Sequence, residues 1–202
     1  MKELMIIRHA RSLYNIEATK DLDAGLTDYG HQQATMAGKF LNEFEGNWNI
    51  ITSPFLRCLQ TSGHIADATQ CGVLVDSRLG EMTVDYHDLV SLKVDKRDVF
   101  PYNWFNYDPV DFAHERMDDY LQRLESFWRD VPNRSIIVTH GSPVLSFIHM
   151  HKGNFDSVPL WDHSVGNCSM TWIKGNRMIW RARELFWELP DRVWSRGVNE
   201  NK

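Results

Sequence analysis

Short apolar runs alternate along this chain with longer stretches of helical spacing, and this alternation constrains the fold more than any other feature. Four runs have the length and the branched side chains of buried strands: residues 4–7, 48–52, 73–75 and 135–139. Strands that alternate with helices are typical of an α/β domain with a largely parallel sheet. Because no repeat, charge block or Pro/Gly-rich linker divides the 202 residues, we predict one domain over residues 1–202.

Helices are predicted from the spacing of apolar residues over residues 27–44, 55–68, 111–131 and 143–151. Thr27 is the expected N-cap of the first helix, because its hydroxyl can accept a hydrogen bond from an unpaired backbone N–H. Near the end of the chain, residues 169–173 and 178–182 are expected to pair as a hairpin that turns at residues 174–176.

Two regions are rich in aromatic residues, and the first of them, before residue 110, has no clean period. Long irregular segments in compact domains are often functional, so we predict that residues 82–110 form an excursion that covers the substrate. Packing over the sheet edge explains their aromatic residues equally well. For the C-terminal segment with Trp180, Trp187 and Trp194, packing back on the domain is the main interpretation, and a homodimer surface is the alternative.

The charge and the cysteines narrow the class of protein. A net charge of -5 argues against a dedicated nucleic-acid binder, which usually carries a basic excess. Three cysteines without CxxC spacing fit reduced thiols, so we expect a cytoplasmic protein. The N-terminal apolar run ends at Arg8 and no later run reaches membrane length, so neither a signal peptide nor a membrane partner is expected.

Charged and polar residues follow several of the predicted strands. Arg8 and His9 follow the first strand, Arg57 lies a few residues after the second, His140 follows residues 135–139, and Glu81 comes after the short strand. Ligands of parallel sheets bind beyond the carboxyl ends of the strands. We therefore expect these five side chains to meet at one edge of the sheet.

This set of residues is suited to phosphoryl chemistry. Guanidinium groups bind phosphoryl oxygens with paired hydrogen bonds. One histidine can act as a nucleophile toward phosphorus, and the other can donate to a phosphoryl oxygen. A carboxylic acid can protonate the leaving oxygen and then activate water. With so many fixed positive donors, neither a metal nor a cofactor is expected. A single arginine or histidine at a strand end is more often an ordinary surface residue, so the argument depends on the whole set.

Local motifs resemble those of the histidine phosphatase superfamily, which includes the cofactor-dependent phosphoglycerate mutases. Five blocks appear in the order of that family: RHARSLYN at residues 8–15, LTDYGHQQA at 26–34, SPFLRCLQT at 53–61, LGE at 79–81 and IIVTHG at 136–141. Each block is weak alone, but five in order extend over most of the chain.

The resemblance implies a three-layer α/β/α fold and a metal-independent phosphomonoesterase that acts through phosphohistidine on a small phosphorylated substrate. It implies that His9 is the nucleophile and that Glu81 is the general acid and then the base. The same resemblance assigns further roles: Arg8, Arg57 and His140 clamp the phosphoryl oxygens, and Ser12, Asn15, Gly141 and Ser142 lie around the phosphate.

Two departures from the family pattern leave alternatives open. Ala10 stands where the family usually has glycine; with a negative φ, its methyl group is expected only to narrow the pocket. Glu81 lacks the usual glycine-rich continuation, so Asp85 is a rival acid. The alternative functions are a phosphoglycerate mutase, although mutases of the family are generally longer, and a phosphate-binding relative without turnover.

Overall fold

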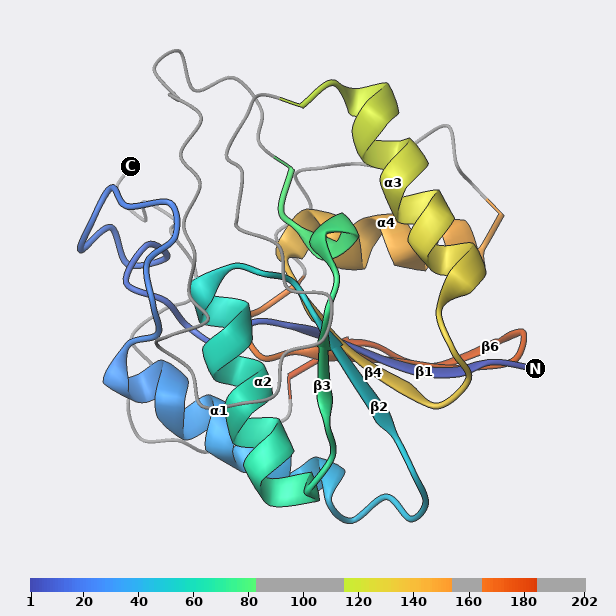
Figure 1. Ribbon diagram of the computed structural model, residues 1–202, viewed down its shortest axis with the longest axis horizontal. Helices are drawn as coiled ribbons and strands as arrows, with labels where there is room; N and C mark the ends of the chain where they lie inside the picture. The colour runs from blue at the N-terminus through green and yellow to red at the C-terminus, as the bar shows by residue number, and fades with distance from the viewer. Residues whose placement is uncertain (83–114, 154–164, 185–202) are drawn as a thin grey trace, which may run out of the picture.

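The computed structural model describes residues 1–82, 115–153 and 165–184, which form a six-stranded sheet with helices on both faces (Figure 1). Its elements, in chain order, are β1 (Glu3–Arg8), α1 (Asp28–Leu41), β2 (Asn49–Thr52), α2 (Leu56–Thr69), β3 (Val73–Val75), the 3-10 turn η1 (Ser77–Leu79), α3 (Met117–Asp130), β4 (Ser135–Thr139), α4 (Gly141–His151), β5 (Met170–Lys174) and β6 (Arg177–Arg183).

The sheet is mixed but mostly parallel, as the sequence predicts. Its strand order is β3-β2-β4-β1-β5-β6. The pairs β2–β3, β2–β4 and β1–β4 are parallel, whereas β5 runs antiparallel to both β1 and β6. Strand β1 therefore lies inside the sheet, and its carboxyl end is beside that of β4, where Arg8 is opposite Thr139.

Alternate side chains of the central strands face two separate cores, which makes the three layers. Leu4 and Ile6 of β1 pack in one apolar cluster with α3 and α4. Met5 and Ile7 belong to a second cluster with side chains of α1 and α2. This period of two is expected for a strand that is covered on both faces. Figure 1 shows the two helix pairs on opposite sides of the sheet.

Helix boundaries differ from the predicted ones for local reasons. Thr27 is the N-cap of α1 and its Oγ1 accepts from the Gly30 N–H at 3.0 Å, as predicted. Helix α4 begins at Gly141, two residues before the predicted start, because Pro143 then falls in the first turn, where a missing N–H costs no helical bond. Helix α3 begins at Met117, and part of its predicted N-terminal extension lies outside the described residues.

The C-terminal hairpin forms between β5 and β6 as predicted. Trp180 of β6 lies against Phe40, Phe44 and Trp172, so this tryptophan packs back on the domain. Trp187, Trp194 and most of the predicted excursion at 82–110 lie outside the described residues. Within the described part of the chain, no helix is long and apolar enough to cross a membrane.

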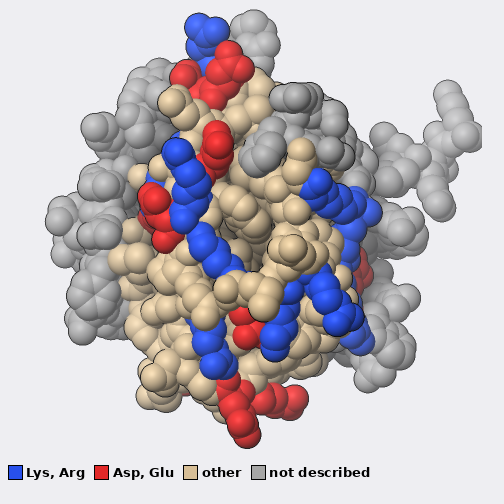
Figure 2. Space-filling view, turned by 90° about the vertical axis from the view of Figure 1, so that its right-hand side faces the viewer, with Lys and Arg blue, Asp and Glu red and all other residues tan. Residues whose placement is uncertain are grey.

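A hollow of about 360 Å³ lies at the amino ends of the parallel strands. Figure 2 shows the molecule from this side. Its lining includes Lys2, just before β1, and Gly175 in the β5–β6 turn. Strand β1 separates this hollow from His9, so it is not the place where the strand-end residues meet.

Candidate active site

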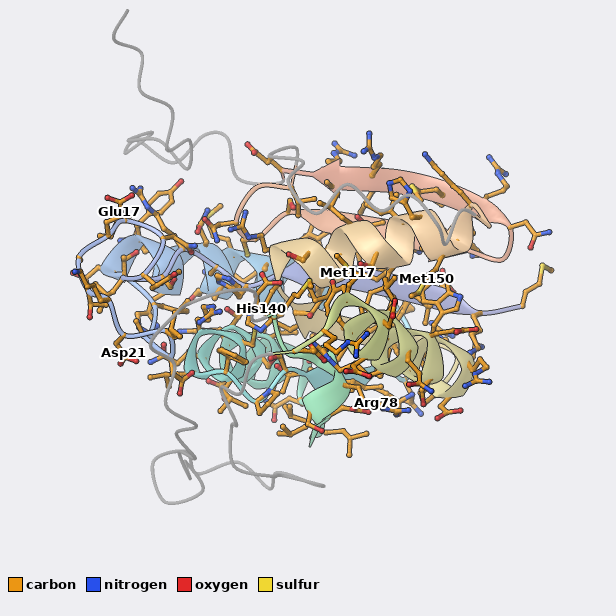
Figure 3. All side chains as sticks on the ribbon, turned by 90° about the horizontal axis from the view of Figure 1, so that it is seen from above. Glu17, Asp21, Arg78, Met117, His140 and Met150 are labelled. Carbon is orange, nitrogen blue, oxygen red and sulfur yellow. The ribbon has the colours of Figure 1, made fainter. Side chains whose placement is uncertain are left out.

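Three of the predicted residues meet in a hydrogen-bonded row beyond the carboxyl ends of the strands. His9 follows β1, Arg57 lies in the first turn of α2, and His140 follows β4. All three are at most 5% exposed. Arg57 Nε donates to His9 Nε2 at 3.2 Å and Arg57 Nη2 donates to His140 Nδ1 at 3.1 Å. Figure 3 shows His140 at the centre of the molecule, on the side toward the Asp21 loop.

The hydrogen bonds of His9 define its tautomer. The Ala10 carbonyl can only accept, so His9 Nδ1, 2.8 Å away, carries the hydrogen. Nε2 is then left with a lone pair, which accepts from Arg57. Burial lowers the pKa of His9 well below its ordinary value, and the charges of Arg57 and Arg8 lower it further. His9 is therefore neutral, with its basic nitrogen facing the cationic groups of the site.

His140 is neutral for similar reasons. Burial lowers its pKa well below the ordinary value, and the Arg57 charge adds to the effect. Because Nδ1 accepts from Arg57, Nε2 carries the hydrogen and donates to Ser53 Oγ at 2.8 Å. Cys58 Sγ lies 3.5 Å from Nε2, and burial raises the pKa of this thiol to about 12, which keeps it protonated. Cys58 is thus a packing residue.

Arg57 is held on three sides by groups from distant parts of the chain. Besides its bonds to the two histidines, its Nη1 donates to the Leu22 carbonyl at 2.6 Å. Burial lowers the pKa of Arg57, but its ordinary value is so high that the guanidinium stays charged. The row thus contains a fixed cation between two neutral imidazoles.

Arg8 supplies a second cation with a free donor. Its Nη1 donates to the Val165 carbonyl, whereas its Nε is buried and has no hydrogen-bond partner among the described residues. A buried N–H without an acceptor costs about 1–3 kcal/mol, more for a charged group. An oxyanion that accepts from this N–H would remove that cost, so the arrangement favours an anionic ligand.

Glu81 lies just after η1, and it shares the electrostatic field of the two arginines. Its charge raises the pKa of both Arg8 and Arg57, against the larger lowering by burial. The carboxylate is half-buried, and its Oε1 accepts from the Met82 N–H at 3.0 Å. The rival acid, Asp85, lies outside the described residues. The structure therefore places Glu81 near the basic groups, while the choice between the two acids stays a prediction.

Ser12 and Asn15 brace the loop after His9. Asn15 Oδ1 accepts from Ser12 Oγ at 2.9 Å and from Asn167 Nδ2 at 3.0 Å. Asn167 Nδ2 also donates to the His9 carbonyl at 3.2 Å. The predicted contact of Ser12 and Asn15 with phosphate stays a prediction, since their side chains hold one another here. Gly141 and Ser142 form the first turn of α4, where backbone N–H groups lack helical partners and favour an anion.

The methyl group of Ala10 does not narrow the pocket, which corrects the prediction. Ala10 is fully buried in a small apolar cluster with Leu26, Ala34, Ala37 and Cys168. It is absent from the described residues with positive φ, so the expected negative φ is confirmed. Its N–H donates to Thr61 Oγ1 at 3.1 Å. Alanine therefore fits here because its methyl group points into a core.

Sequence reasoning missed the residues that support this site. Ser53 and Asn167 hold His140 and the His9 carbonyl, and Arg123 contacts the segment that carries Glu81. Ser53 could have been found from its place directly after a strand, at the start of the block at 53–61, and Asn167 from its place before a late strand, where the sequence resembles the family. Arg123 has no local signal. No group of three or more His, Cys, Asp or Glu side chains that could hold a metal ion occurs within residues 1–82, 115–153 and 165–184.

Comparisons with known proteins identify the family. The family model of the histidine phosphatase superfamily, branch 1, matches residues 4–188. A Hydrogenobacter thermophilus protein with the provisional name phosphoserine phosphatase 2 is 31% identical over 184 residues, 85% of this chain and 88% of that protein. An Escherichia coli protein with the provisional name phosphoglycerate mutase GpmB is 25% identical, over 90% of this chain and 89% of its own length.

Solved structures share the fold. A mycobacterial glucosyl-3-phosphoglycerate phosphatase in complex with VO3 superposes with a TM-score of 0.63 at 21% identity, covering 91% of this chain and all of that chain. Bacillus stearothermophilus YhfR gives a TM-score of 0.62 at 21% identity, with 88% and 94% covered. With its three-layer sheet, the row of His9, Arg57 and His140, and a family model that matches nearly the whole chain, this protein belongs to branch 1 of the histidine phosphatase superfamily.

Proposed function

We propose that this protein hydrolyses small phosphomonoesters through a phosphohistidine on His9. The observation that carries the proposal is the Nε2 lone pair of a neutral, buried His9, held by Arg57 beside the unpartnered N–H of Arg8. A nucleophile and two fixed cations at one point are what displacement at a phosphorus atom requires.

In the first step, His9 Nε2 attacks phosphorus, the P–N bond forms, and the bond from phosphorus to the ester oxygen breaks. Glu81, in its acid form, gives its proton to the departing oxygen, so that an alcohol leaves. In the second step, Glu81 takes a proton from water, whose oxygen attacks phosphorus. The P–N bond then breaks, which releases phosphate and restores neutral His9.

The arginines stabilise charge that develops on the phosphoryl oxygens. We assign this clamp to Arg8, Arg57 and His140, whose Nε2–H donates to Ser53 Oγ. Loss of one such donor typically costs about 3–4 kcal/mol of transition-state stabilisation. Backbone N–H groups of Gly141 and Ser142 complete the proposed cradle.

The proposed substrate is a small phosphomonoester in the cytoplasm, where the free thiols of Cys58, Cys71 and Cys168 remain reduced. The name of the Hydrogenobacter relative makes phosphoserine the first compound to assay. We propose no nucleic-acid or membrane partner. A homodimer through the tryptophan-rich C-terminal segment remains a proposal that a sedimentation experiment tests.

The experiment is phosphate release from EDTA-treated protein with phosphoserine, sugar phosphates and p-nitrophenyl phosphate. We expect activity that survives EDTA and is lost in His9→Ala. His151→Ala is the matched control, since His151 lies at the far end of α4. The phosphoryl group that labels the protein should be lost in acid and kept in base, as it is from phosphohistidine.

Three outcomes would contradict the proposal. Unchanged hydrolysis by His9→Ala would exclude the nucleophile. Interconversion of phosphoglycerates far faster than hydrolysis would establish a mutase, the function in the name of the Escherichia coli relative. Phosphate binding without hydrolysis or labelling would establish a non-catalytic relative.

A further inference from the structure

The segment that carries Glu81 is held by side chains more than by a strand ladder or a long helix. Within the short turn η1 and just after it, the carbonyls of Arg78, Leu79 and Glu81 each accept from a side chain. Thr139, at the end of β4, donates to Leu79 at 2.7 Å. The position of the acid therefore depends on donors that come from elsewhere in the chain.

Arg123 of α3 supplies the other two of these donors. Its Nη1 donates to the Arg78 carbonyl, and its Nη2 donates to the Glu81 carbonyl at 3.3 Å. One planar guanidinium thus binds the segment at both ends of four residues. A guanidinium is suited to this task because its N–H groups point in fixed directions.

Other residues hold Arg123 itself in place. Glu115 accepts from Arg123 Nε and, at 2.8 Å, from Nη2, which makes a paired ion bridge between side chains about 20% exposed. The guanidinium carbon lies 4.9 Å from the centre of the Tyr120 ring, and the Tyr120 hydroxyl lies 3.0 Å from Ser146 Oγ of α4. Glu115 and Tyr120 therefore hold the Arg123 guanidinium in addition to its contacts with the segment.

Helix α3 contacts the same segment a second time through Arg78. The Arg78 side chain bridges Asp76, the N-cap of η1, to Asp130 near the end of α3, with 2.8 Å to each carboxylate. Figure 3 shows Arg78 beside this helix. This bridge anchors η1, whereas Arg123 reaches two residues further, to Glu81.

We propose that Arg123 is a positioning residue for the Glu81 acid, through its hydrogen bond to the Glu81 backbone and its bridge to Glu115. The inference rests on the proposed function, in which Glu81 protonates the departing oxygen. Arg123 touches no reacting atom. It acts by keeping the Glu81 carboxyl within reach of that oxygen.

The proposal makes a specific prediction about leaving groups. An alkoxide such as that of phosphoserine leaves poorly without a proton, whereas p-nitrophenolate leaves well unprotonated. A misplaced acid therefore slows hydrolysis of phosphoserine and spares p-nitrophenyl phosphate. Misfolding or a lower fraction of native protein slows both substrates by the same factor, so the ratio of the two kcat/KM values separates positioning from folding.

The experiment measures this ratio for wild type, Arg123→Met, Arg123→Lys, Glu115→Gln and Glu81→Gln. Arg129→Met is the matched control, because Arg129 is the other arginine of α3 and is exposed. General acids contribute about 10²- to 10⁴-fold, so for Arg123→Met we expect about a tenfold or larger loss on the alkyl ester. The loss on the aryl ester should stay within about threefold, and Arg123→Lys and Glu115→Gln should lie between.

The outcomes separate this inference from the proposed function. If Glu81→Gln loses the alkyl ester selectively and Arg123→Met does not, the positioning role is wrong while the acid role stands. If Glu81→Gln itself shows no selectivity, the acid role is wrong. Equal losses on both substrates in Arg123→Met would also overturn the inference, because they indicate a structural role alone. The same shift in ratio in Arg129→Met would overturn it as well.

Discussion

The two halves of the site are built differently. His9, the proposed nucleophile, lies directly after the inner strand β1, and its ring is held by the Ala10 carbonyl in the loop after β1 and by Arg57 in the helix after β2. Glu81 lies on an irregular segment, and side chains of α3 and β4 hold its backbone. The nucleophile is thus positioned by residues that directly follow strands of the sheet, and the acid mainly by helix α3, with one further donor from β4. This division predicts that the two halves can be damaged separately.

The largest effect is expected at the centre of the nucleophile half. Arg57→Ala removes the donor to both imidazoles and one of two cations, so kcat/KM should fall about 10²- to 10³-fold on aryl and alkyl esters alike. Arg57 also contributes to the low pKa of His9. Its removal lets that pKa rise, so the acid limb of the pH profile of kcat/KM should move to higher pH.

A loss confined to the alkyl ester in Arg57→Ala would contradict the separation of the two halves. Arg129→Ala serves as the control for loss of an arginine, since its side chain lies far from both.

Low pH should lower the stability of the folded protein through the buried histidines of the nucleophile half. Burial holds the pKa of His9 and His140 well below the unfolded value of about 6.5, so the unfolded chain binds more protons below that pH. Their contribution to stability is complete above about pH 6.5 and is lost as the pH falls toward the folded values. In that window, each histidine should lower the free energy of unfolding by about 1.4 kcal/mol for every unit by which the pH falls.

Urea unfolding of wild type and His140→Gln at pH 7.5 and 5.5 checks this expectation. The variant should lose less stability between the two pH values than wild type does. Equal losses would show that His140 does not contribute. His64, whose pKa is also lowered by burial, remains in both proteins and cancels in the comparison.

A smaller effect is expected where the two halves meet. Thr139→Val removes the donor to the Leu79 carbonyl and leaves that acceptor buried, which should lower the free energy of unfolding by about 1–2 kcal/mol. Because Leu79 lies two residues before Glu81, its displacement should move the acid. Activity on the alkyl ester should therefore fall more than activity on the aryl ester. Thr69→Val, in which the deleted hydroxyl bonds a carbonyl of its own helix, is the control. A selective loss on the aryl ester would contradict the link to the acid.

The smallest effect is expected for Ala10→Gly. The methyl group of Ala10 lies in an apolar cluster, so its loss should cost about 1 kcal/mol of stability through lost burial and added backbone freedom. Activity per folded molecule should remain within about twofold, because the methyl group does not face the site. A large rise in activity would show that alanine obstructs the pocket after all.

The nucleophile half was predictable because its residues lie in local patterns. Arg8, His9 and His140 stand at strand ends, and Arg57 lies in the first turn of a helix that follows a strand, so strand boundaries and the family motifs together predicted that they meet at one edge of the sheet. The tautomer of His9 was not predictable, because it depends on the orientation of one carbonyl in the loop. The direction of the Ala10 methyl group was missed because it too depends on the backbone conformation of this loop.

The acid half was less predictable because its contacts are distant in sequence. Arg123 lies 42 residues from Glu81, and nothing in its neighbourhood distinguishes it from another charged residue on an amphipathic helix. The alternation of strands and helices predicted a largely parallel sheet, and the family resemblance implied the three layers. The antiparallel place of β5 between β1 and β6 needed the structure.

The place of β1 in the sheet has a consequence for how the chain matures on the ribosome. It is the first strand to be synthesised, yet its neighbours are β4, whose Ser135 pairs with Leu4, and β5, which ends at Lys174. At the usual rate of translation, the apolar strand before His9 waits on the order of ten seconds for its first neighbour. During that interval it depends on chaperones or transient collapse for protection, and an interrupted product would lack the strands that flank the proposed nucleophile.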